Sequence, residues 1–370
     1  MWYAIRPDSL TVWSDKRVRN ALKWYYSVMK NERLAKFLIA KHVEAPCDYK
    51  ELDLGELWRV HDKLHHTFTR LWSEVAKGEI TLESTSSPRC SFLDVKVEIA
   101  RRVLSSCVFC ENRCRVNRLD GERGVCRLDY KTVVSSYFHH LGEEAPLVPS
   151  GTIFYGGCTF RCVFCQNHDI SQEYPYPGVV VDAKGLAKIQ KELRGTGARN
   201  INHVGGDPTP NTHTILESLK YLEVNVPQIW NSNQYQSAET MKLLVDVIDL
   251  WLPDFKYWSD ECAERLSGIR NYREVVTRNL KISIEHGDMI IRHLVMPNHI
   301  ECCSIPILEW ISKNLPRDKV VVNIMDQYRP EYLVARYPER YKEISRRVTA
   351  DEMAIVYREA ERLGLLYGVV

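Results

Sequence analysis

Residues 151–165 have the sequence GTIFYGGCTFRCVFC. The first five residues form a short apolar run typical of a strand, and a cysteine loop follows it directly. Its cysteines, Cys158, Cys162 and Cys165, have C-x3-C-x2-C spacing. Thiolates carried by one short loop bind iron–sulfur clusters, and three thiolates leave one iron of a four-iron cluster without a protein ligand. The stretch therefore predicts a strand followed by a [4Fe-4S] cluster with one open iron.

A structural zinc site is the alternative at this loop. Zinc in such a site has four protein ligands, and His168 is the residue that could supply the fourth. An open iron has a different consequence, because a substrate or cofactor can then coordinate the metal directly. Catalysis requires that access, whereas a structural site does not.

From residue 151 onward, segments typical of strands and helices alternate. Strands are expected at 151–155, 200–204, 228–230, 250–255, 289–295 and 319–324, and helices at 182–193, 211–222, 237–248, 272–286, 304–313 and 350–363. This order predicts an α/β fold with a parallel sheet and right-handed crossovers. Six units suit a partial (β/α)6 TIM-type barrel better than a complete eight-fold one. A doubly wound open sheet is the alternative, although no G-x-G-x-x-G turn follows the first strand.

Residues 1–105 carry helical rather than strand patterns, with apolar residues at three- and four-residue spacing in 16–41 and 54–77. We therefore expect a helical N-terminal region over 1–105, a cysteine-rich metal-binding segment over 106–145 and the barrel over 146–370. His61 and His65 lie four residues apart and could share a metal ion. The alternative is that they occupy the solvated face of an amphipathic helix.

A second group of cysteines precedes the first strand, with C-x2-C-x3-C-x11-C spacing. Its members are Cys107, Cys110, Cys114 and Cys126. Four thiolates can close a tetrahedral zinc site or hold a second cluster with no open iron. Both alternatives remain open, and both make this segment a metal site.

The composition indicates a protein without a membrane span or a strong attraction to nucleic acid. The chain has 370 residues with a net charge of +2, and its apolar runs are too short to cross a bilayer. Residues 1–7 lack the pattern of a signal peptide, so we expect a reducing, cytoplasmic setting in which clustered cysteines bind metal. The remaining cysteines are expected to be buried structural thiols: Cys47, Cys90, Cys262, Cys302 and Cys303.

The cysteine spacing, the position of the loop after the first strand and Phe164 directly before Cys165 resemble the radical S-adenosylmethionine (SAM) superfamily. The resemblance implies that SAM chelates the open iron and that Phe164 packs near the adenine. Gly205, Gly206 and Asp207 resemble the G-G-E segment of the family, whose backbone contacts the SAM amino group. Asp207 stands where glutamate is usual. The alternative is an ordinary strand-to-helix turn in which Asp207 is the capping residue.

Later strand ends resemble those of the enzymes that activate glycyl radical enzymes. Residues 230–233 (WNSN), with Ser232, resemble T-N-G, and Asp254 and Lys256 resemble D-x-K. Residues 291–297 (IRHLVMP), with Arg292, resemble I-R-x-x-V-x-P. The resemblance implies that these side chains bind SAM or substrate, with Lys256 and Arg292 the foremost candidates and Asp254 as a partner for one of them. The alternative is simple exposure to solvent.

The second cysteine group, GEEAP at 142–146 and CQN at 165–167 resemble uncharacterised homologues of the pyruvate formate-lyase activating enzyme. The resemblance covers about residues 105–365. It implies an oxidoreductase that cleaves SAM reductively and uses the 5′-deoxyadenosyl radical to abstract hydrogen from a protein substrate. Ferredoxin or flavodoxin would be the reductant. One departure matters, because activating enzymes with extra clusters carry eight added cysteines after the radical motif, whereas here four precede it.

Two other functions remain open. The first is radical modification of a small metabolite, lipid or peptide, with the helical N-terminal region covering the mouth of the barrel. The second is a non-catalytic iron–sulfur or zinc protein that does not use SAM. It would require every match at the strand ends to be accidental.

Overall fold

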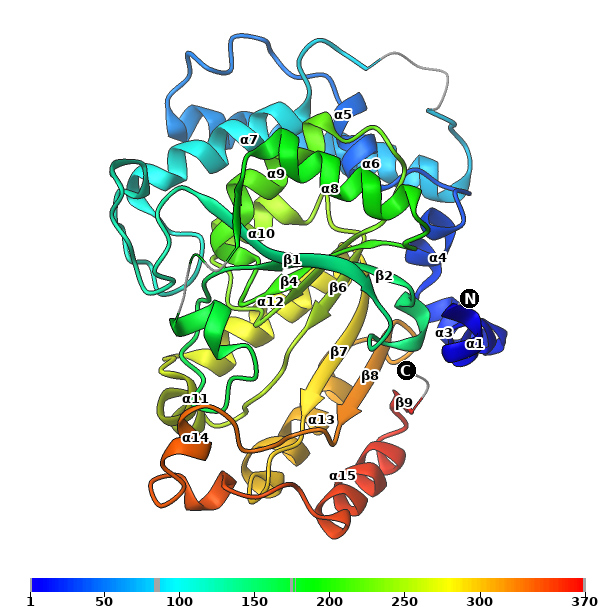
Figure 1. The fold of residues 1–370 in the computed structure, drawn as a ribbon. Coiled ribbons are helices and arrows are strands. Elements are labelled where there is room, and N and C mark those ends of the chain that lie inside the picture. The colour runs from blue at the N-terminus through cyan, green and yellow to red at the C-terminus, as the bar shows by residue number, and fades with distance from the viewer. Residues whose placement is uncertain (1, 83–86, 174–175, 177, 369–370) are drawn as a thin grey trace.

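The computed structural model describes residues 2–82, 87–173, 176 and 178–368 (Figure 1). These residues form a nine-stranded sheet in the order β3-β1-β2-β4-β5-β6-β7-β8-β9. The strands are β1 (Thr132–His140), β2 (Ser150–Tyr155), β3 (Val179–Val181), β4 (Ile201–Gly205), β5 (Gln228–Ser232), β6 (Leu250–Pro253), β7 (Asp288–Leu294), β8 (Val320–Met325) and β9 (Leu366–Tyr367). Neighbouring strands are parallel from β2 to β9, and β1 is antiparallel to both β2 and β3.

The six strands expected from the sequence are β2, β4, β5, β6, β7 and β8. Each begins and ends within two residues of its expected bounds. The prediction of an α/β fold with a parallel sheet is therefore confirmed. These six strands lie side by side in chain order, whereas a doubly wound sheet reverses direction at a switch point. The doubly wound alternative is wrong for this chain.

Helices follow the strands and cover the sheet (Figure 1). They are α8 (Ala183–Gly195), α9 (Thr212–Tyr221), α10 (Ala238–Leu244), α11 (Asp260–Ser267), α12 (Tyr272–Glu285), α13 (Ile305–Asn314), α14 (Leu333–Arg336) and α15 (Ala350–Arg362). Asp182, Ser237 and Thr349 cap α8, α10 and α15 with their side-chain oxygens. Helix α11 was not expected, because its buried apolar side chains are only Ala263 and Leu266.

Three strands were not predicted from the sequence, for different reasons. Strands β3 and β9 have three and two residues, which is too short for an alternation to be recognised. In β1 the pairing with β2 shifts between Val134 and Ser136, so a bulge interrupts the two-residue period. Part of the segment expected to be a metal-binding loop is therefore the antiparallel neighbour of β2.

The N-terminal helices contact the amino ends of the strands. The chain begins with α1 (Trp2–Ile5), α2 (Asp8–Thr11), α3 (Lys16–Ala21), α4 (Lys23–Met29), α5 (Lys36–His42), α6 (Leu54–Lys77) and α7 (Phe92–Val103). The Trp24 indole donates to Asp249, just before β6, and the Tyr25 amide donates to Asp288 at the start of β7, at 2.8 and 2.7 Å. The expectation that this region covers the mouth of the barrel is wrong for α4, because the strands carry their functional loops at the other end.

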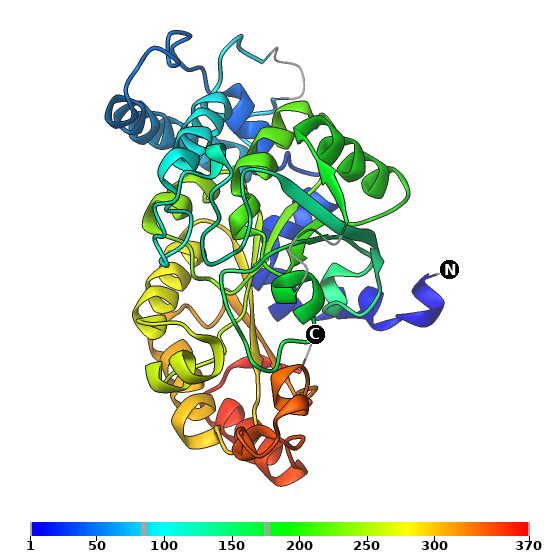
Figure 2. The same ribbon diagram turned by 60° about the vertical axis from the view of Figure 1, so that its left-hand side comes forward.

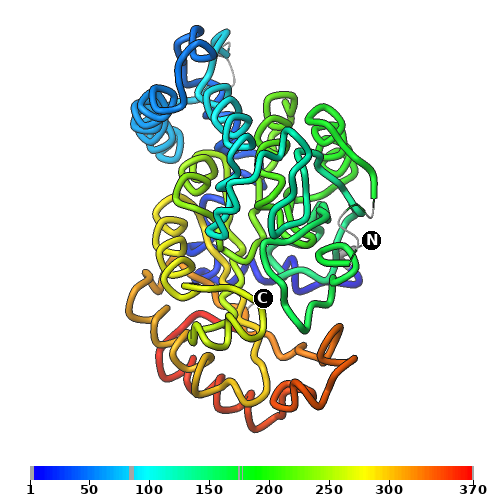
Figure 3. The backbone as a smooth tube through the Cα atoms, turned by 90° about the vertical axis from the view of Figure 1, so that its left-hand side faces the viewer, coloured from blue at the N-terminus to red at the C-terminus, as the bar shows by residue number. Residues whose placement is uncertain are grey.

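Helices α6 and α7 lie at the opposite end of the molecule from α13 and α15 (Figures 1 and 3). His61 and His65 on α6 do not form a metal pair. His61 Nε2 lies 3.0 Å from Lys96 Nζ, and His65 Nδ1 lies 2.9 Å from Asp246 Oδ1. Lys96 and Asp246 form a fully buried ion pair, so both histidines belong to a structural polar network. Within the described residues, no helix has the length and hydropathy to cross a bilayer.

Cys47 and Cys90 are joined in a disulfide, with their Cα atoms 5.4 Å apart. The expectation that both are free buried thiols is therefore wrong. Backbone hydrogen bonds hold the two segments together, from the Ala45 amide to the Cys90 carbonyl and from the Phe92 amide to the Val43 carbonyl. The two cysteines are 43 residues apart in the sequence, so no local pattern could show that they meet.

The buried carboxyl groups at the amino ends of the strands predict a pH dependence of folding. Burial raises the pKa of Asp249 to about 6 and that of Asp288 to about 7. Between about pH 4 and 7 the folded state then holds protons that the unfolded state has released. The free energy of unfolding should therefore fall as the pH rises through this window.

Asp288→Asn keeps an oxygen for the Tyr25 amide and removes the ionisation. Between pH 5 and 8, we expect the free energy of unfolding of this variant to fall less steeply with pH than that of the parent. The difference between the two slopes corresponds to at most about one proton per molecule. Urea unfolding at several pH values measures both slopes. Equal slopes for the parent and the variant would contradict this account of Asp288.

Candidate active site

The cysteine loop after β2 is held in place by α11. The amide of Arg161 donates to the carbonyl of Ser267, and the amide of Val163 donates to that of Leu266, both at 2.9 Å. Cys158 and Cys162 are 6% and 8% exposed, and Cys165 is partly buried. The loop therefore presents two buried thiols and one accessible thiol from a fixed backbone.

Each of the three sulfur atoms has a polar neighbour. The Phe160 amide donates to Cys158 Sγ at 3.3 Å, Ser267 Oγ donates to Cys162 Sγ at 3.0 Å, and Ser171 Oγ lies 3.3 Å from Cys165 Sγ. Burial raises the pKa of Cys158 well above its usual range and that of Cys162 to about 12. Without a bound cation these thiols would stay neutral, whereas donors aimed at sulfur stabilise thiolates. The loop therefore fits a metal centre.

His168, the alternative zinc ligand, has other partners. Its Nδ1 lies 3.4 Å from Glu173 Oε2, and its ring stacks on Tyr332 with the ring centres 4.6 Å apart. The structure thus places this side chain against Glu173 and Tyr332.

The glycines at the end of β4 are required by backbone packing. A Cβ on Gly205 would overlap the backbone of Tyr155 in the neighbouring strand β2, and φ of Gly205 is +112°. A Cβ on Gly206 would overlap the carbonyl oxygen of Gly157. The sequence analysis linked these glycines to close approach of a ligand, but here the backbone of β2 approaches Gly205 and that of the cysteine loop approaches Gly206.

Asp207 connects the cysteine loop to the loops after β4 and β5. Its carboxylate accepts hydrogen bonds from Thr159 Oγ1 at 2.6 Å, Asn233 Nδ2 at 3.0 Å and the Thr209 amide at 2.8 Å. The contact with Thr209 is the turn-capping role considered as the alternative. The contact with Thr159 lies between two of the cysteines, so Asp207 holds the loop in position.

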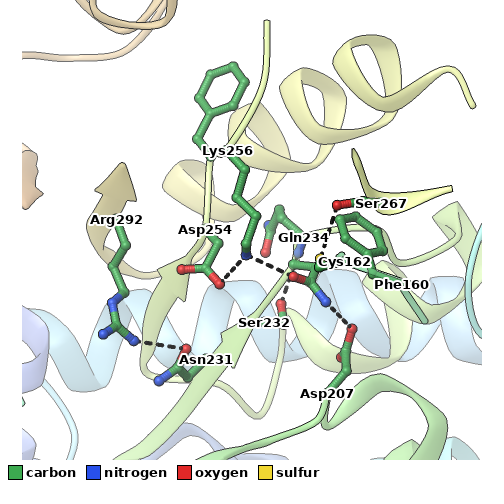
Figure 4. Close-up of polar contacts among 12 residues, drawn as sticks. Phe160, Cys162, Asp207, Asn231, Ser232, Gln234, Asp254, Lys256, Ser267 and Arg292 are labelled. Atoms are coloured by element: carbon green, nitrogen blue, oxygen red, sulfur yellow. Dashed lines mark hydrogen bonds and ion pairs between the residues drawn. The ribbon is translucent and has the colours of Figure 1, made fainter. Parts of the chain in front are cut away.

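Lys256 forms a partly buried ion pair beside the cysteine loop (Figure 4). Its Nζ lies 2.5 Å from Asp254 Oδ2 and donates to Asn233 Oδ1 at 2.9 Å. Burial alone would lower the pKa of Lys256, but the charge of Asp254, and that of Cys162 when it is a thiolate, outweigh it and raise this pKa. Lys256 therefore stays cationic next to the thiols. Asn233 also donates to Cys158 Sγ at 3.4 Å, which connects this pair to the loop.

Arg292 has a partner that the sequence analysis did not assign. Arg292 Nε lies 3.1 Å from Glu144 Oε1. Its terminal nitrogen donates to Asn231 Oδ1 at 3.3 Å (Figure 4). Glu144 is buried and also accepts from Asn323 Nδ2 at 2.8 Å. Two adjacent glutamates in an otherwise apolar stretch, 142–148, were the signal that could have marked this residue.

Ser232 and Phe164 are less available to a ligand than the cationic side chains. Ser232 Oγ accepts from Gln236 Nε2 at 2.8 Å and from the Gln234 amide at 3.2 Å. Phe164 is 5% exposed and meets Tyr328 edge to face, with the ring centres 5.7 Å apart. Both side chains lie near the loop, but their described contacts are with the protein itself.

The second cysteine group comes together around one small cavity. The cysteines that line it are Cys107, Cys110, Cys114 and Cys126. Arg118 is fully buried beside them, with a terminal nitrogen 3.9 Å from Cys107 Sγ. The segment docks onto the loop after β5 through hydrogen bonds from the Glu111 amide to the Tyr235 carbonyl and from the Ser237 amide to the Phe109 carbonyl (Figure 2). The structure thus places a four-thiol site next to the candidate active site.

The chain resembles known proteins over most of its length. An uncharacterized protein of Methanocaldococcus jannaschii is 45% identical over 350 residues, which is 93% of this chain and 98% of that protein. Solved structures of SuiB from Streptococcus suis with its precursor peptide SuiA and of methylornithine synthase (PylB) align with TM-scores of 0.40 and 0.41. Both are 16% identical and match 57% of this chain, but only 46% and 60% of their own. Residues 152–311 match the model of the radical SAM superfamily, so this part of the chain is a radical SAM domain and the protein is an enzyme.

Proposed function

We propose that Cys158, Cys162 and Cys165 bind the [4Fe-4S] cluster of a radical SAM enzyme, with SAM at the open iron. When bound and reduced, the cluster supplies the electron that cleaves SAM into methionine and a 5′-deoxyadenosyl radical. One observation carries the proposal: one fixed loop presents three thiols, each beside a polar group, and Cys158 and Cys162 lie near the cationic, partly buried Lys256. The match to the superfamily's model supports it.

We infer that the chain binds and orients SAM with the polar groups at the ends of β4 to β7. Lys256 and Arg292 are the cations that would contact the SAM carboxylate or the substrate, and Asp254 and Glu144 fix their positions. The cofactor-binding set would comprise Phe164, Gly205, Gly206, Asp207, Ser232, Asp254, Lys256 and Arg292. Within it, Asp207 acts by holding the cysteine loop, since its carboxylate already accepts three hydrogen bonds from the protein.

We propose that the parallel strands form a partial (β/α)6 barrel. Their chain-order arrangement and the helix after each strand support this architecture. We propose that the chain is divided into a helical region over 1–105, a cysteine-rich segment over 106–145 and a barrel over 146–370. In this arrangement the cysteine-rich segment adds β1 to the sheet, between β2 and the edge strand β3.

We propose that the second cysteine group holds a metal centre, either zinc or a further iron–sulfur cluster. Its four thiols line one cavity, and burial raises the pKa of Cys110 and Cys126, so a metal is needed to keep them as thiolates. Arg118 would offset part of the thiolate charge. Iron, sulfide and zinc analysis of a Cys110→Ser variant assigns the metal, because only the bound element decreases.

We propose that the hydrogen is abstracted from a protein substrate in the cytoplasm, with ferredoxin or flavodoxin as reductant. The similarity of 254–256 and 291–297 to the activating enzymes supports this choice. The alternative substrate is a small metabolite, lipid or peptide. An electron paramagnetic resonance doublet on a second protein would identify a glycyl radical partner, and a modified small molecule would identify the alternative.

Reductive cleavage of SAM should depend on the thiols of the loop. We expect the anaerobically reconstituted and reduced parent to form 5′-deoxyadenosine from SAM, and a Cys162→Ala variant to form none, because one cluster ligand is lost. Chromatography of the nucleoside products measures both. The Cys47→Ser/Cys90→Ser variant is the control, since its disulfide lies outside the site. A reduced, cluster-loaded parent that neither cleaved nor bound SAM would contradict the proposal.

The hydroxyl of Ser267 should tune the cluster. Removing a donor from a thiolate ligand disfavours the added electron, so Ser267→Ala should lower the reduction potential by on the order of tens of mV. A redox titration followed by electron paramagnetic resonance measures the shift. Ser105→Ala is the matched control, because the Ser105 hydroxyl is exposed and donates to Arg102. An unchanged potential in Ser267→Ala would show that this hydroxyl does not act on the cluster.

A further inference from the structure

Two segments far apart in the sequence bring metal-binding atoms together outside the site described above. Cys262 lies in the first turn of α11, and His299 and Cys302 lie in the loop after β7, where Ile300–Ser304 form a short π-helical turn, η7. The two thiol sulfurs and an imidazole nitrogen all lie within 4.8 Å of one another. Neither segment belongs to the cysteine motifs of the proposed cluster or of the second cysteine group.

The orientation of His299 is that of a metal ligand. Its Nδ1 lies 2.9 Å from the carbonyl oxygen of Pro297, and His299 is 6% exposed. A carbonyl oxygen only accepts hydrogen bonds, so in the neutral ring Nδ1 carries the hydrogen and Nε2 keeps its lone pair. Histidines that bind metal usually donate their second nitrogen to a carbonyl or carboxylate in this way, which fixes the tautomer and the ring.

The surrounding hydrogen bonds hold the two segments in place. The Cys262 amide donates to Ser259 Oγ, which caps α11. In the other segment, the Cys303 amide donates to the His299 carbonyl at 3.1 Å, and Ser304 Oγ lies 2.8 Å from His293 Nε2 in β7. The site is therefore assembled by the fold before any metal arrives, which lowers the ordering cost of binding.

A third thiol lies next to this group. Cys303 is 1% exposed, and its Sγ lies 3.8 Å from Cys302 Sγ. Cys302 itself is exposed, so its expected burial as a structural thiol is wrong. An exposed ligand leaves the site open to metal ions from solution. Oxidation of Cys262 and Cys302 to a disulfide is the reaction that would compete with metal binding.

We propose that Cys262 Sγ, His299 Nε2 and Cys302 Sγ bind one divalent zinc ion, with water in the fourth position. Two thiolates and one imidazole are the donor set that zinc prefers, and three protein ligands with one open position is a common zinc geometry. Binding releases the thiol protons and changes no oxidation state. The proposal does not depend on the function of the cysteine loop.

The position of the ion suggests its effect. It joins the first turn of α11 to the loop after β7. The last turn of α11 holds the cysteine loop, through the carbonyls of Leu266 and Ser267 and the Ser267 hydroxyl on Cys162. Zinc would therefore brace the helix on which the proposed cluster loop rests.

Elemental analysis of anaerobically purified full-length protein, loaded with zinc and freed of excess, tests the proposal. The parent should hold about one zinc per chain more than the Cys302→Ser variant, with the same iron content. Cys303→Ser is the matched control and should keep that zinc, because all three ligands remain. X-ray absorption at the zinc edge should show sulfur at about 2.3 Å and nitrogen at about 2.0 Å in the parent. Reloading zinc should slow hydrogen exchange of residues 259–267 in the parent but not in Cys302→Ser.

Equal zinc content in the parent and Cys302→Ser would overturn the proposal. So would a Cys262–Cys302 disulfide found by mass spectrometry in the anaerobic protein after zinc loading. The His299→Gln variant is a second test, in case Cys302→Ser loses zinc only because it misfolds. This variant keeps both thiols and should also lose the zinc. If it retained the zinc at the parent level, the imidazole would not be a ligand and the proposed site would be wrong.

Discussion

Close packing of backbone at Gly157 and Gly206 is the constraint on which the site depends. A Cβ on Gly206 would overlap the carbonyl of Gly157, and a Cβ on Gly157 would lie 2.8 Å from the carbonyl oxygen of Cys126. The end of β4, the cysteine loop and the second cysteine segment thus approach one another backbone to backbone, and the Leu128 side chain also packs against Gly157. Because the backbones come this close, main-chain geometry limits the relative position of the two cysteine groups.

Buried charges occur at both ends of the parallel strands, but they serve different purposes. At the amino ends, Asp249 and Asp288 accept hydrogen bonds from the N-terminal helices, so their oxygens are used by the fold. At the carboxyl ends, Lys256 and Arg292 are paired with Asp254 and Glu144, and Glu144 Oε2 accepts no hydrogen bond from a donor in the described part of the chain. These groups at the carboxyl ends are the ones to which the proposed function assigns ligand binding.

Helix α11 shows how an element without a strong sequence signal can organise a site. Its eight residues bury only Ala263, Leu266 and Ser267. Yet its last turn binds the backbone of the cysteine loop and the sulfur of Cys162. A short, mostly polar helix leaves little periodicity to recognise, and its importance comes from what it contacts.

The sequence by itself determined the parts of this protein that are encoded locally. Six parallel strands follow from runs of apolar residues, and the three thiols of the loop follow from cysteines within eight residues of one another. The tertiary structure alone decided which distant residues meet: Glu144 with Arg292, Cys47 with Cys90, and the N-terminal helices with the amino ends of the strands. Periodicity and short spacing are properties of a chain segment, whereas these contacts depend on how whole elements pack.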